Sequence, residues 1–277
     1  MGVIVLKCDY HMHTYYSDDS STPMKSQVKR AIELGLDEIC FTDHVDYGVK
    51  VDCDEPNPKH MAVNVNYPKY FREIDEMRNE FRGIKIKAGL EFGVQTHTIN
   101  QYERLFERYH DELDFILLSI HQINDLDLWS GEYQSGRTQD EYNRCYYNEL
   151  LNVMKNFHDY SVLAHLDLIV RYDRKGIYPF DKVRDIVNEI LRTAIDDHKG
   201  IELNTSSRRY KLTDTQPSRE ILKMYREMGG EIITLGSDAH TPDYVYAYME
   251  EAKNILRDLG YRYFCTFDKM NPVFHEL

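Results

Sequence analysis

Six histidines of this chain follow short apolar runs and lie in small polar motifs that could do chemistry. They are His11 and His13 in "HMHT", His44 in "TDH", His121 in "SIH", His165 in "AHLDL" and His240 in "GSDAH". Two acids have similar positions, Glu91 in "GLEFG" and Asp238 beside His240. Imidazole and carboxylate groups bind zinc, manganese and iron, and sites without cysteine ligands are typically hydrolytic. One such histidine alone is more often a hydrogen-bonded core residue, but the whole set favours a metal site.

The elements that must position these residues alternate between short strands and longer helices. We expect strands at 3–10, 37–44, 84–93, 114–121, 161–168, 200–206 and 231–240. We expect helices at 21–35, 68–82, 97–111, 139–157, 181–198, 217–229 and 243–259, the first with a Ser/Thr cap, Pro23 in its first turn and Gly35 at its end. This alternation predicts an α/β fold, a distorted (β/α)7 barrel of TIM-like type. No linker divides the chain, so we expect a single domain over residues 1–277.

The carboxyl ends of parallel barrel strands converge on one face, where such enzymes hold their active sites. The polar motifs end the predicted strands, so we expect them to meet at this face. Two polar, irregular stretches interrupt the alternation, at 47–66 and at 122–138, and the second holds the single tryptophan, Trp129. They are either loops that bind a ligand at the barrel mouth or ordinary solvated connections.

Composition excludes some classes of partner. A formal net charge of -13 opposes binding to nucleic acid, and no apolar window is long enough for a membrane helix, so we expect a cytoplasmic protein that acts on neither. The cysteines, Cys8, Cys40, Cys53, Cys145 and Cys265, lack paired spacing and are interpreted as small buried hydrophobic residues. The other histidines, His60, His97, His110, His158, His198 and His275, are interpreted as surface or packing residues. The protein is expected to be a monomer or a homodimer.

Taken in order, the six motifs resemble those of the polymerase-and-histidinol-phosphatase (PHP) superfamily. The match spans residues 9–240, and with "HLDLIVRY" and "ELNTSSRR" the chain is most similar to the histidinol-phosphate phosphatases of histidine biosynthesis. The resemblance implies a metal-dependent enzyme that hydrolyses a small phosphate monoester, L-histidinol phosphate. A related phosphoesterase acting on nucleotides or other small esters is the alternative, and a non-catalytic barrel with a structural metal is the third.

The resemblance also implies three divalent metal ions (zinc, manganese or iron) and a ligand set. His11, His13, Glu91 and Asp238 would hold the first ion, and Glu91 would bridge to a second ion held by His121 and His165. The third would take His44, His240 and an acid from the first motif, for which spacing favours Asp19 over Asp18. The resemblance does not account for Asp43, which lies beside His44 and would either orient an imidazole or cap the end of a strand.

Hydrolysis of a phosphate monoester needs an activated nucleophile and positive charge around the phosphoryl oxygens. The metals would activate a water molecule, with Glu91, Asp238 and Arg171 as the catalytic residues. Arg171, Arg208 and Arg209 could bind the phosphate through the planar guanidinium, although solvated surface arginines are the alternative. Asp238 or a metal-bound water would protonate the leaving alkoxide.

Overall fold

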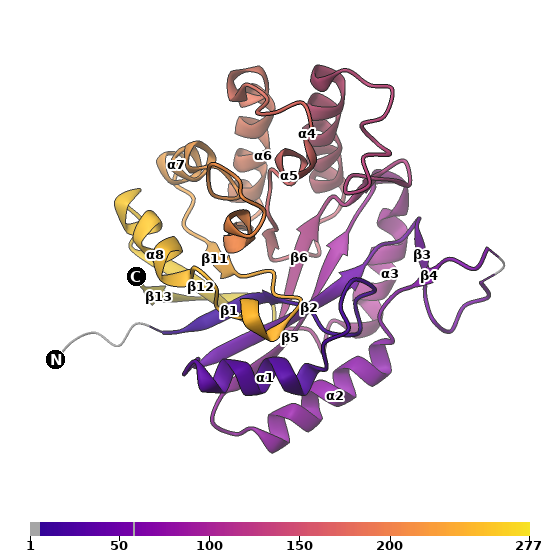
Figure 1. Cartoon of the computed structure of the whole chain (residues 1–277), viewed down its shortest axis with the longest axis vertical. Coiled ribbons are helices and arrows are strands. Elements are labelled where there is room, and N and C mark those ends of the chain that lie inside the picture. The colour runs from indigo at the N-terminus through magenta and orange to yellow at the C-terminus, as the bar shows by residue number, and fades with distance from the viewer. Residues whose placement is uncertain (1–5, 58) are drawn as a thin grey trace.

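A parallel sheet of seven strands is the centre of the computed structural model, which describes residues 6–57 and 59–277 (Figure 1). The strands, in sheet order, are β1 (Cys8–Met12), β2 (Glu38–Val45), β5 (Lys85–Gly93), β6 (Phe115–Ser119), β9 (Val162–Leu163), β10 (Gly200–Asn204) and β11 (Ile233–Gly236). A parallel bridge joins Met12 to Ala239 just beyond β11, and the His13 N–H donates to the Ala239 carbonyl at 2.9 Å. This contact brings the two edges of the sheet together, so the sheet is a nearly closed barrel, as the sequence predicts.

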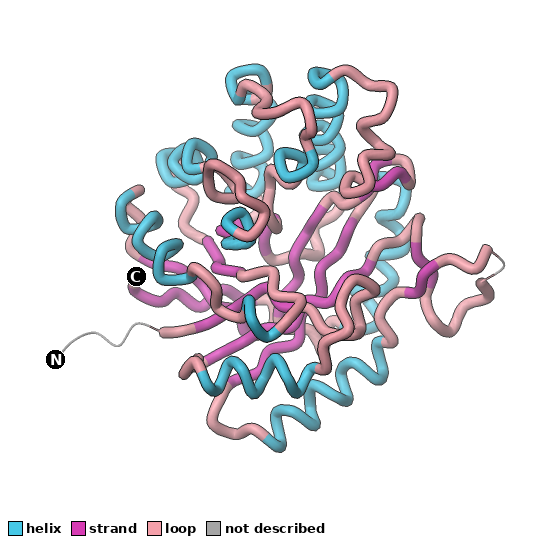
Figure 2. The backbone as a smooth tube through the Cα atoms, in the orientation of Figure 1, coloured by secondary structure: helices cyan, strands magenta, loops and turns pink. Residues whose placement is uncertain are grey.

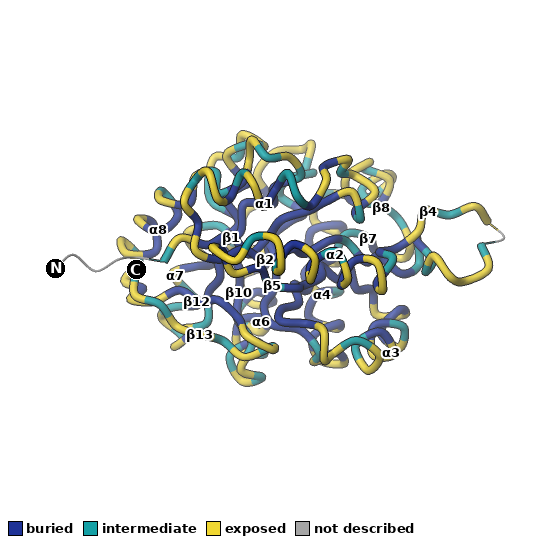
Figure 3. The backbone as a smooth tube through the Cα atoms, turned by 90° about the horizontal axis from the view of Figure 1, so that it is seen from below, coloured by how far each residue is buried: buried dark blue, intermediate teal, exposed yellow. Residues whose placement is uncertain are grey.

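Helices surround the strands (Figure 2). They are α1 (Met24–Glu33), α2 (Tyr67–Glu80), α3 (Ile99–Tyr109), α4 (Gln139–Asn156), α5 (Ile169–Tyr172), α6 (Arg184–Asp196), α7 (Arg219–Glu227) and α8 (Met249–Asp258), with 3-10 turns η1 (Thr96–Thr98), η2 (Phe180–Lys182), η3 (Thr205–Arg208) and η4 (Pro242–Tyr244). The strands are buried and the outer faces of the helices are exposed, so the core lies inside the barrel and between barrel and helices (Figure 3). None of the described helices is long and apolar enough to cross a membrane.

Several expected elements differ at their ends, among them the helix expected at 243–259, which begins only at Met249, and three strands. The strand expected at 161–168 is reduced to β9, because His165 has φ +24° and turns the chain out of the sheet. The strand expected at 231–240 ends at Gly236, before Asp238 with φ +57°. Of the strand expected at 3–10, residues 3–5 lie outside the described residues, and β1 begins at Cys8.

The expected Ser/Thr cap of the first helix is wrong. Pro23 itself is the N-cap residue, and no side chain caps the helix. The Ser20 and Thr22 hydroxyls instead each donate to the His240 carbonyl at 2.8 Å. Gly35 follows the helix with φ +69°, the left-handed conformation that favours glycine at this position. The hydroxyls near α1 therefore fix the loop after β11.

Small strand pairs were not expected from the sequence. They are β3 (Lys50–Val51) with β4 (Ala62–Val63), β7 (Gln122–Ile123) with β8 (Leu126–Asp127), and the antiparallel hairpin of β12 (Tyr263–Asp268) and β13 (Asn271–Glu276). The hairpin packs at the barrel's interior, where the Phe267 N–H donates to the Tyr10 hydroxyl at 3.0 Å. Of the five cysteines, Cys8, Cys40 and Cys265 are buried as expected, whereas Cys53 and Cys145 are exposed.

Candidate metal centre

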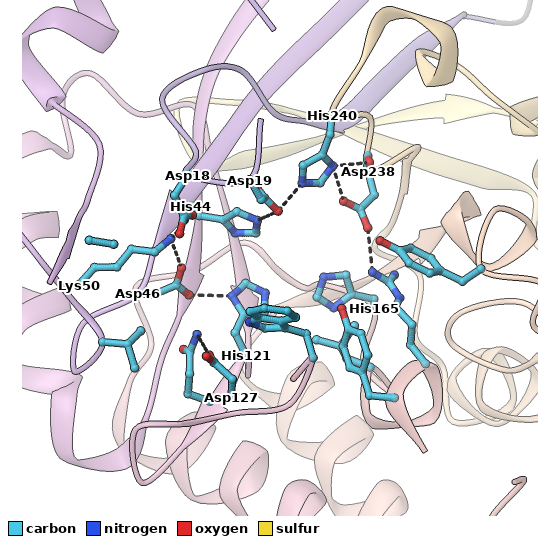
Figure 4. A pocket seen from close by; sticks show the side chains of 18 residues that line it. Asp18, Asp19, His44, Asp46, Lys50, His121, Asp127, His165, Asp238 and His240 are labelled. Atoms are coloured by element: carbon cyan, nitrogen blue, oxygen red, sulfur yellow. Dashed lines mark hydrogen bonds and ion pairs between the residues drawn. The ribbon is translucent and has the colours of Figure 1, made fainter. Parts of the chain in front are cut away.

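The carboxyl ends of six strands bring the predicted residues to one mouth of the barrel, and Figure 4 shows those that line the cavity there, among them His44, His121, His165, Asp238 and His240. His11 lies in β1 and His44 in β2, and the register of β2 with β5 places His44 directly opposite Glu91. His121 follows β6, His165 follows β9, and Asp238 and His240 follow β11. A cavity of about 650 Å³ opens above them. Parallel strands therefore do assemble residues that are as far apart in sequence as His11 and His240.

Glu91 lies at the centre of this cluster and is fully buried. One carboxylate oxygen, Oε2, lies 3.0 Å from His11 Nε2, 3.1 Å from His44 Nδ1 and 3.5 Å from His13 Nε2. The other, Oε1, lies 2.9 Å from His165 Nε2 and 3.1 Å from His121 Nε2. Burial opposes the ionisation of Glu91, but the nearby His11, His44 and His121 hold its pKa well below the usual range. Each oxygen thus faces its own group of imidazoles.

Two aspartates complete the cluster from opposite sides. Asp238 Oδ1 lies 3.5 Å from His13 Nε2 and 3.8 Å from His11 Nε2. Asp19 Oδ2 lies 2.8 Å from His240 Nε2 and 3.5 Å from His44 Nε2. Asp18, the alternative to Asp19, turns to the Lys50 ammonium at 2.6 Å instead. The structure therefore brings Asp19, rather than Asp18, to the histidines.

The donor set fits divalent metal ions. In the part of the chain that the structure describes, ring nitrogens and carboxylate oxygens form five groups of three, each within 4.8 Å. Among them are His11, His13 and Glu91, then Glu91, His121 and His165, and finally His13, His44 and His240. His13 Nε2 and His44 Nδ1 are buried, and although each lies within 3.5 Å of Glu91 Oε2, neither makes a hydrogen bond to any of the described residues. Buried polar nitrogens without partners are costly, and a bound cation would satisfy them. This arrangement supports divalent metal binding at the mouth of the barrel.

A second layer of acids, not predicted from the sequence, orients two of the imidazoles. His11 Nδ1 lies 2.7 Å from Glu202 Oε1 in β10, and His121 Nδ1 lies 2.7 Å from Asp46 Oδ1. With Nδ1 held in this way, the Nε2 atom of each ring faces Glu91. A signal for Glu202 was present, because a lone carboxylate inside the apolar strand "GIELN" must be buried and therefore needs a partner.

Asp43 acts on the loop after β1 and contacts no imidazole directly. Its carboxylate accepts from the Thr14 N–H and from the Ser17 hydroxyl, both at 2.7 Å. The same Ser17 oxygen lies 3.2 Å from His13 Nδ1 and accepts from the His44 N–H at 3.0 Å. Asp43 thus fixes a backbone segment, and through Ser17 it also affects the position of His13.

The three predicted arginines have different surroundings. Arg171, on α5, is buried and lines the cavity, and its Nη1 donates to Asp238 Oδ2 at 3.3 Å. Burial lowers the pKa of Arg171, but the Asp238 carboxylate more than offsets this and keeps the group protonated. Arg209 donates through Nη2 to the Asp238 carbonyl at 2.8 Å, and Arg208 pairs with Glu251 on α8. Arg208 is thus turned to the exposed surface, and only Arg171 of the three lines the cavity.

Both irregular stretches supply walls of the cavity. Val49, Lys50 and Ala62 come from 47–66, and Gln122, Asp127 and Trp129 come from 122–138. Lys50 joins two acids, since its Nζ lies 2.8 Å from Asp46 Oδ2 and 2.6 Å from Asp18 Oδ1. Of the two interpretations given for these stretches, ligand-binding loops fit the structure better than plain solvated connections.

Comparison with known proteins agrees with this geometry. The model of the PHP domain family matches residues 9–206. A histidinol-phosphatase of Lactococcus lactis is 32% identical over 95% of each chain, and a protein of Clostridium acetobutylicum described as a probable histidinol-phosphatase is 29% identical over 97% of this chain and 96% of its own length.

Solved structures agree as well. The crystal structure of the L. lactis histidinol phosphate phosphatase, complexed with zinc, L-histidinol and phosphate, superposes with a TM-score of 0.83, at 32% identity over 96% of this chain and 98% of that one. A histidinol phosphatase described as putative, from Listeria monocytogenes, shares the fold with a TM-score of 0.74 at 17% identity, over 88% of this chain and 99% of that one. The chain belongs to the PHP domain family.

Proposed function

We propose that this protein is a metal-dependent phosphomonoesterase that hydrolyses L-histidinol phosphate to L-histidinol and phosphate, in histidine biosynthesis. The observation that carries the proposal is a cavity with imidazoles and carboxylates at its base and a buried arginine on its wall. Its substrate is proposed from the relatives, above all from the L. lactis enzyme, whose structure is described as complexed with zinc, L-histidinol and phosphate.

The residues present would hold three divalent ions, with zinc, manganese and iron as the candidates. His11, His13, Glu91 and Asp238 would hold the first, Glu91, His121 and His165 the second, and Asp19, His44 and His240 the third. Such ions supply an activated water and neutralise charge on the phosphoryl oxygens.

The chain's own residues would position the reacting groups, supply positive charge and help to transfer a proton. Glu91 divides its two oxygens between two groups of imidazoles and so sets their spacing. Arg171 brings a buried positive charge to the cavity, where it would bind a phosphoryl oxygen. Asp238 lies between Arg171 and His13, and the proton that water loses on attack would reach the departing alkoxide either through Asp238 or through a water held at the ions. One P–O bond forms as the ester P–O bond breaks, and no phosphoenzyme is needed.

A small substrate panel tests the proposal. We expect the metal-loaded protein to have a higher kcat/KM for L-histidinol phosphate than for an aryl phosphate or a mononucleotide. Preference for the mononucleotide or the aryl phosphate would support the second candidate, a related phosphoesterase, and would refute the histidinol assignment. A metal-loaded protein that hydrolyses none of the three would refute both.

A further inference from the structure

Gln216 is a fully buried residue that contacts Arg171 from the segment between η3 and α7. Its Oε1 accepts two hydrogen bonds from the guanidinium, from Nη2 at 2.8 Å and from Nε at 3.2 Å. Arginine can only donate, so the amide oxygen must face it. The amide nitrogen then faces the Asp167 carbonyl, to which it donates at 3.3 Å. These hydrogen bonds therefore show which end of the amide is the oxygen and which is the nitrogen, and they hold the side chain in one orientation.

This contact decides which atoms of Arg171 remain for a ligand. A guanidinium has five N–H donors, and the edge formed by Nε and Nη2 commonly binds an oxyanion through two parallel hydrogen bonds. Here Gln216 occupies that edge, and the second Nη2 proton goes to the Ser206 hydroxyl at 2.7 Å. One Nη1 proton goes to Asp238 at 3.3 Å. The remaining Nη1 proton faces the cavity, where Tyr172 also lies beside the guanidinium, so contact with a phosphoryl oxygen would be through Nη1 alone.

The acceptor on that edge is neutral. A carboxylate at position 216 could accept the same two hydrogen bonds, but its charge would cancel that of Arg171. The amide satisfies the donors without adding a second carboxylate to the one that Asp238 already places 3.3 Å from Arg171 Nη1. The face of the guanidinium packs on the Tyr210 ring, whose centre lies 4.2 Å from the central carbon, and this contact adds no negative charge either.

We propose that Gln216 is a positioning residue for phosphate recognition, which fixes Arg171 by its Nε–Nη2 edge through a neutral oxygen and so presents Nη1 to the phosphoryl group without adding a second negative charge to that of Asp238. The inference rests on the proposed function in one respect, which is that the ligand carries a phosphoryl group. It does not depend on which alcohol that group esterifies.

Gln216→Glu tests the charge, because it retains the size and the acceptor. We expect the affinity of the metal-loaded enzyme for inorganic phosphate to fall by about tenfold or more, measured by calorimetry and by inhibition of aryl phosphate hydrolysis. The thermal midpoint and metal content should stay close to those of the parent. Gln101→Glu, on α3, adds the same charge away from the cavity and should leave phosphate affinity unchanged.

Gln216→Met tests whether Gln216 positions Arg171, because it removes the acceptor without adding charge. It also tests the inference if the Gln216→Glu variant does not fold. We expect phosphate affinity to fall by about threefold or more and KM for phosphate esters to rise more than kcat falls. Parent-like phosphate affinity in either folded, metal-loaded variant would overturn the inference.

Both assays use inorganic phosphate and an aryl ester. A parent enzyme that prefers another ester to L-histidinol phosphate would thus refute the proposed substrate but leave the role of Gln216 open to the same measurement.

Discussion

At the scale of single residues, the site depends most on Glu91. Its register partner in the sheet is His44, and its two oxygens together lie within 3.5 Å of five imidazoles. A buried carboxylate in such a place stays ionised only where positive charge and hydrogen-bond donors surround it. Charge at this position is therefore more important than size, and an isosteric neutral residue is the sharpest test.

Glu91→Gln should nearly abolish turnover while the fold is retained. The amide matches the volume of the carboxylate but lacks the charge and one of the two acceptor oxygens. We expect kcat to fall by more than about 100-fold, beyond the effect typical of residues behind the ligands. Turnover within tenfold of the parent, in a folded and metal-loaded variant, would show that Glu91 does not bridge two ions.

Arg171→Met should impair every phosphomonoester alike. It removes a charged donor that would contact the group common to all of them, so we expect a loss of about 2 kcal/mol, or about 30-fold, in kcat/KM. The ratio of kcat/KM between L-histidinol phosphate and an aryl phosphate should stay constant. A large change in that ratio would mean that Arg171 binds the alcohol part instead.

The residue types of the site could be predicted from sequence, because parallel strands carry their functional residues at their ends. Side-chain direction could not. Arg208 and Arg209 are neighbours at the end of a 3-10 turn, and only the tertiary structure sends one to Glu251 and the other to the Asp238 carbonyl. Likewise Asp46 and Glu202 act through contacts with residues 75 and 191 positions away, which no local pattern encodes.

At the scale of elements, the loop that follows one strand orients residues that follow a different strand. Asp46, just beyond β2, holds His121, which follows β6, while Lys50 in β3 holds both Asp46 and Asp18. The sequence predicted β2, β5 and the long helices well, because their patterns are long. It failed where His165 and Asp238 take positive φ angles, since bulky residues seldom adopt them and strain of this kind is set by surrounding contacts.

Asp46→Asn should weaken the site without removing a predicted ligand. The amide can turn its oxygen or its nitrogen toward His121 Nδ1, and the fixed tautomer of the ring is then lost. We expect a loss of about 10–100-fold in metal affinity or kcat. Titration of the metal-free variant with zinc measures the first quantity. Parent-like metal affinity together with parent-like kcat would contradict an orienting role.

Tyr102→Phe should lower stability. The buried hydroxyl of Tyr102, on α3, is 2.8 Å from the Val45 and Gly93 carbonyls and accepts from the Tyr47 N–H at 3.1 Å, so it joins the ends of β2 and β5. Phenylalanine retains the ring but leaves these groups without a partner, at a cost of about 1–3 kcal/mol. Urea denaturation should show it as a lower midpoint with an unchanged slope. An unchanged midpoint would mean that water replaces the hydroxyl.

At the scale of the whole molecule, the contacts that close the barrel lie among the residues of the site. The bridge between Met12 and Ala239 lies between the site residues His11 and His13 on one side and Asp238 and His240 on the other. The Gln27 amide nitrogen donates to both the His13 and Ala239 carbonyls at 3.0 Å and supports the same junction. Loss of ions from this site would therefore leave carboxylates and imidazoles from both edges of the sheet without compensation.

Metal removal should thus reduce stability as well as activity. We expect elemental analysis to find about two to three equivalents of transition metal per chain after growth in metal-supplemented medium, because the ligands form several adjoining groups. A ligand present at a hundred times its Kd stabilises the folded state by about 2.7 kcal/mol, so chelation should lower the thermal midpoint by several degrees. Re-addition of the metal should restore both the midpoint and turnover. Less than one equivalent in the supplemented protein would exclude a site of three ions, and a midpoint unaffected by chelation would show that barrel closure does not depend on them.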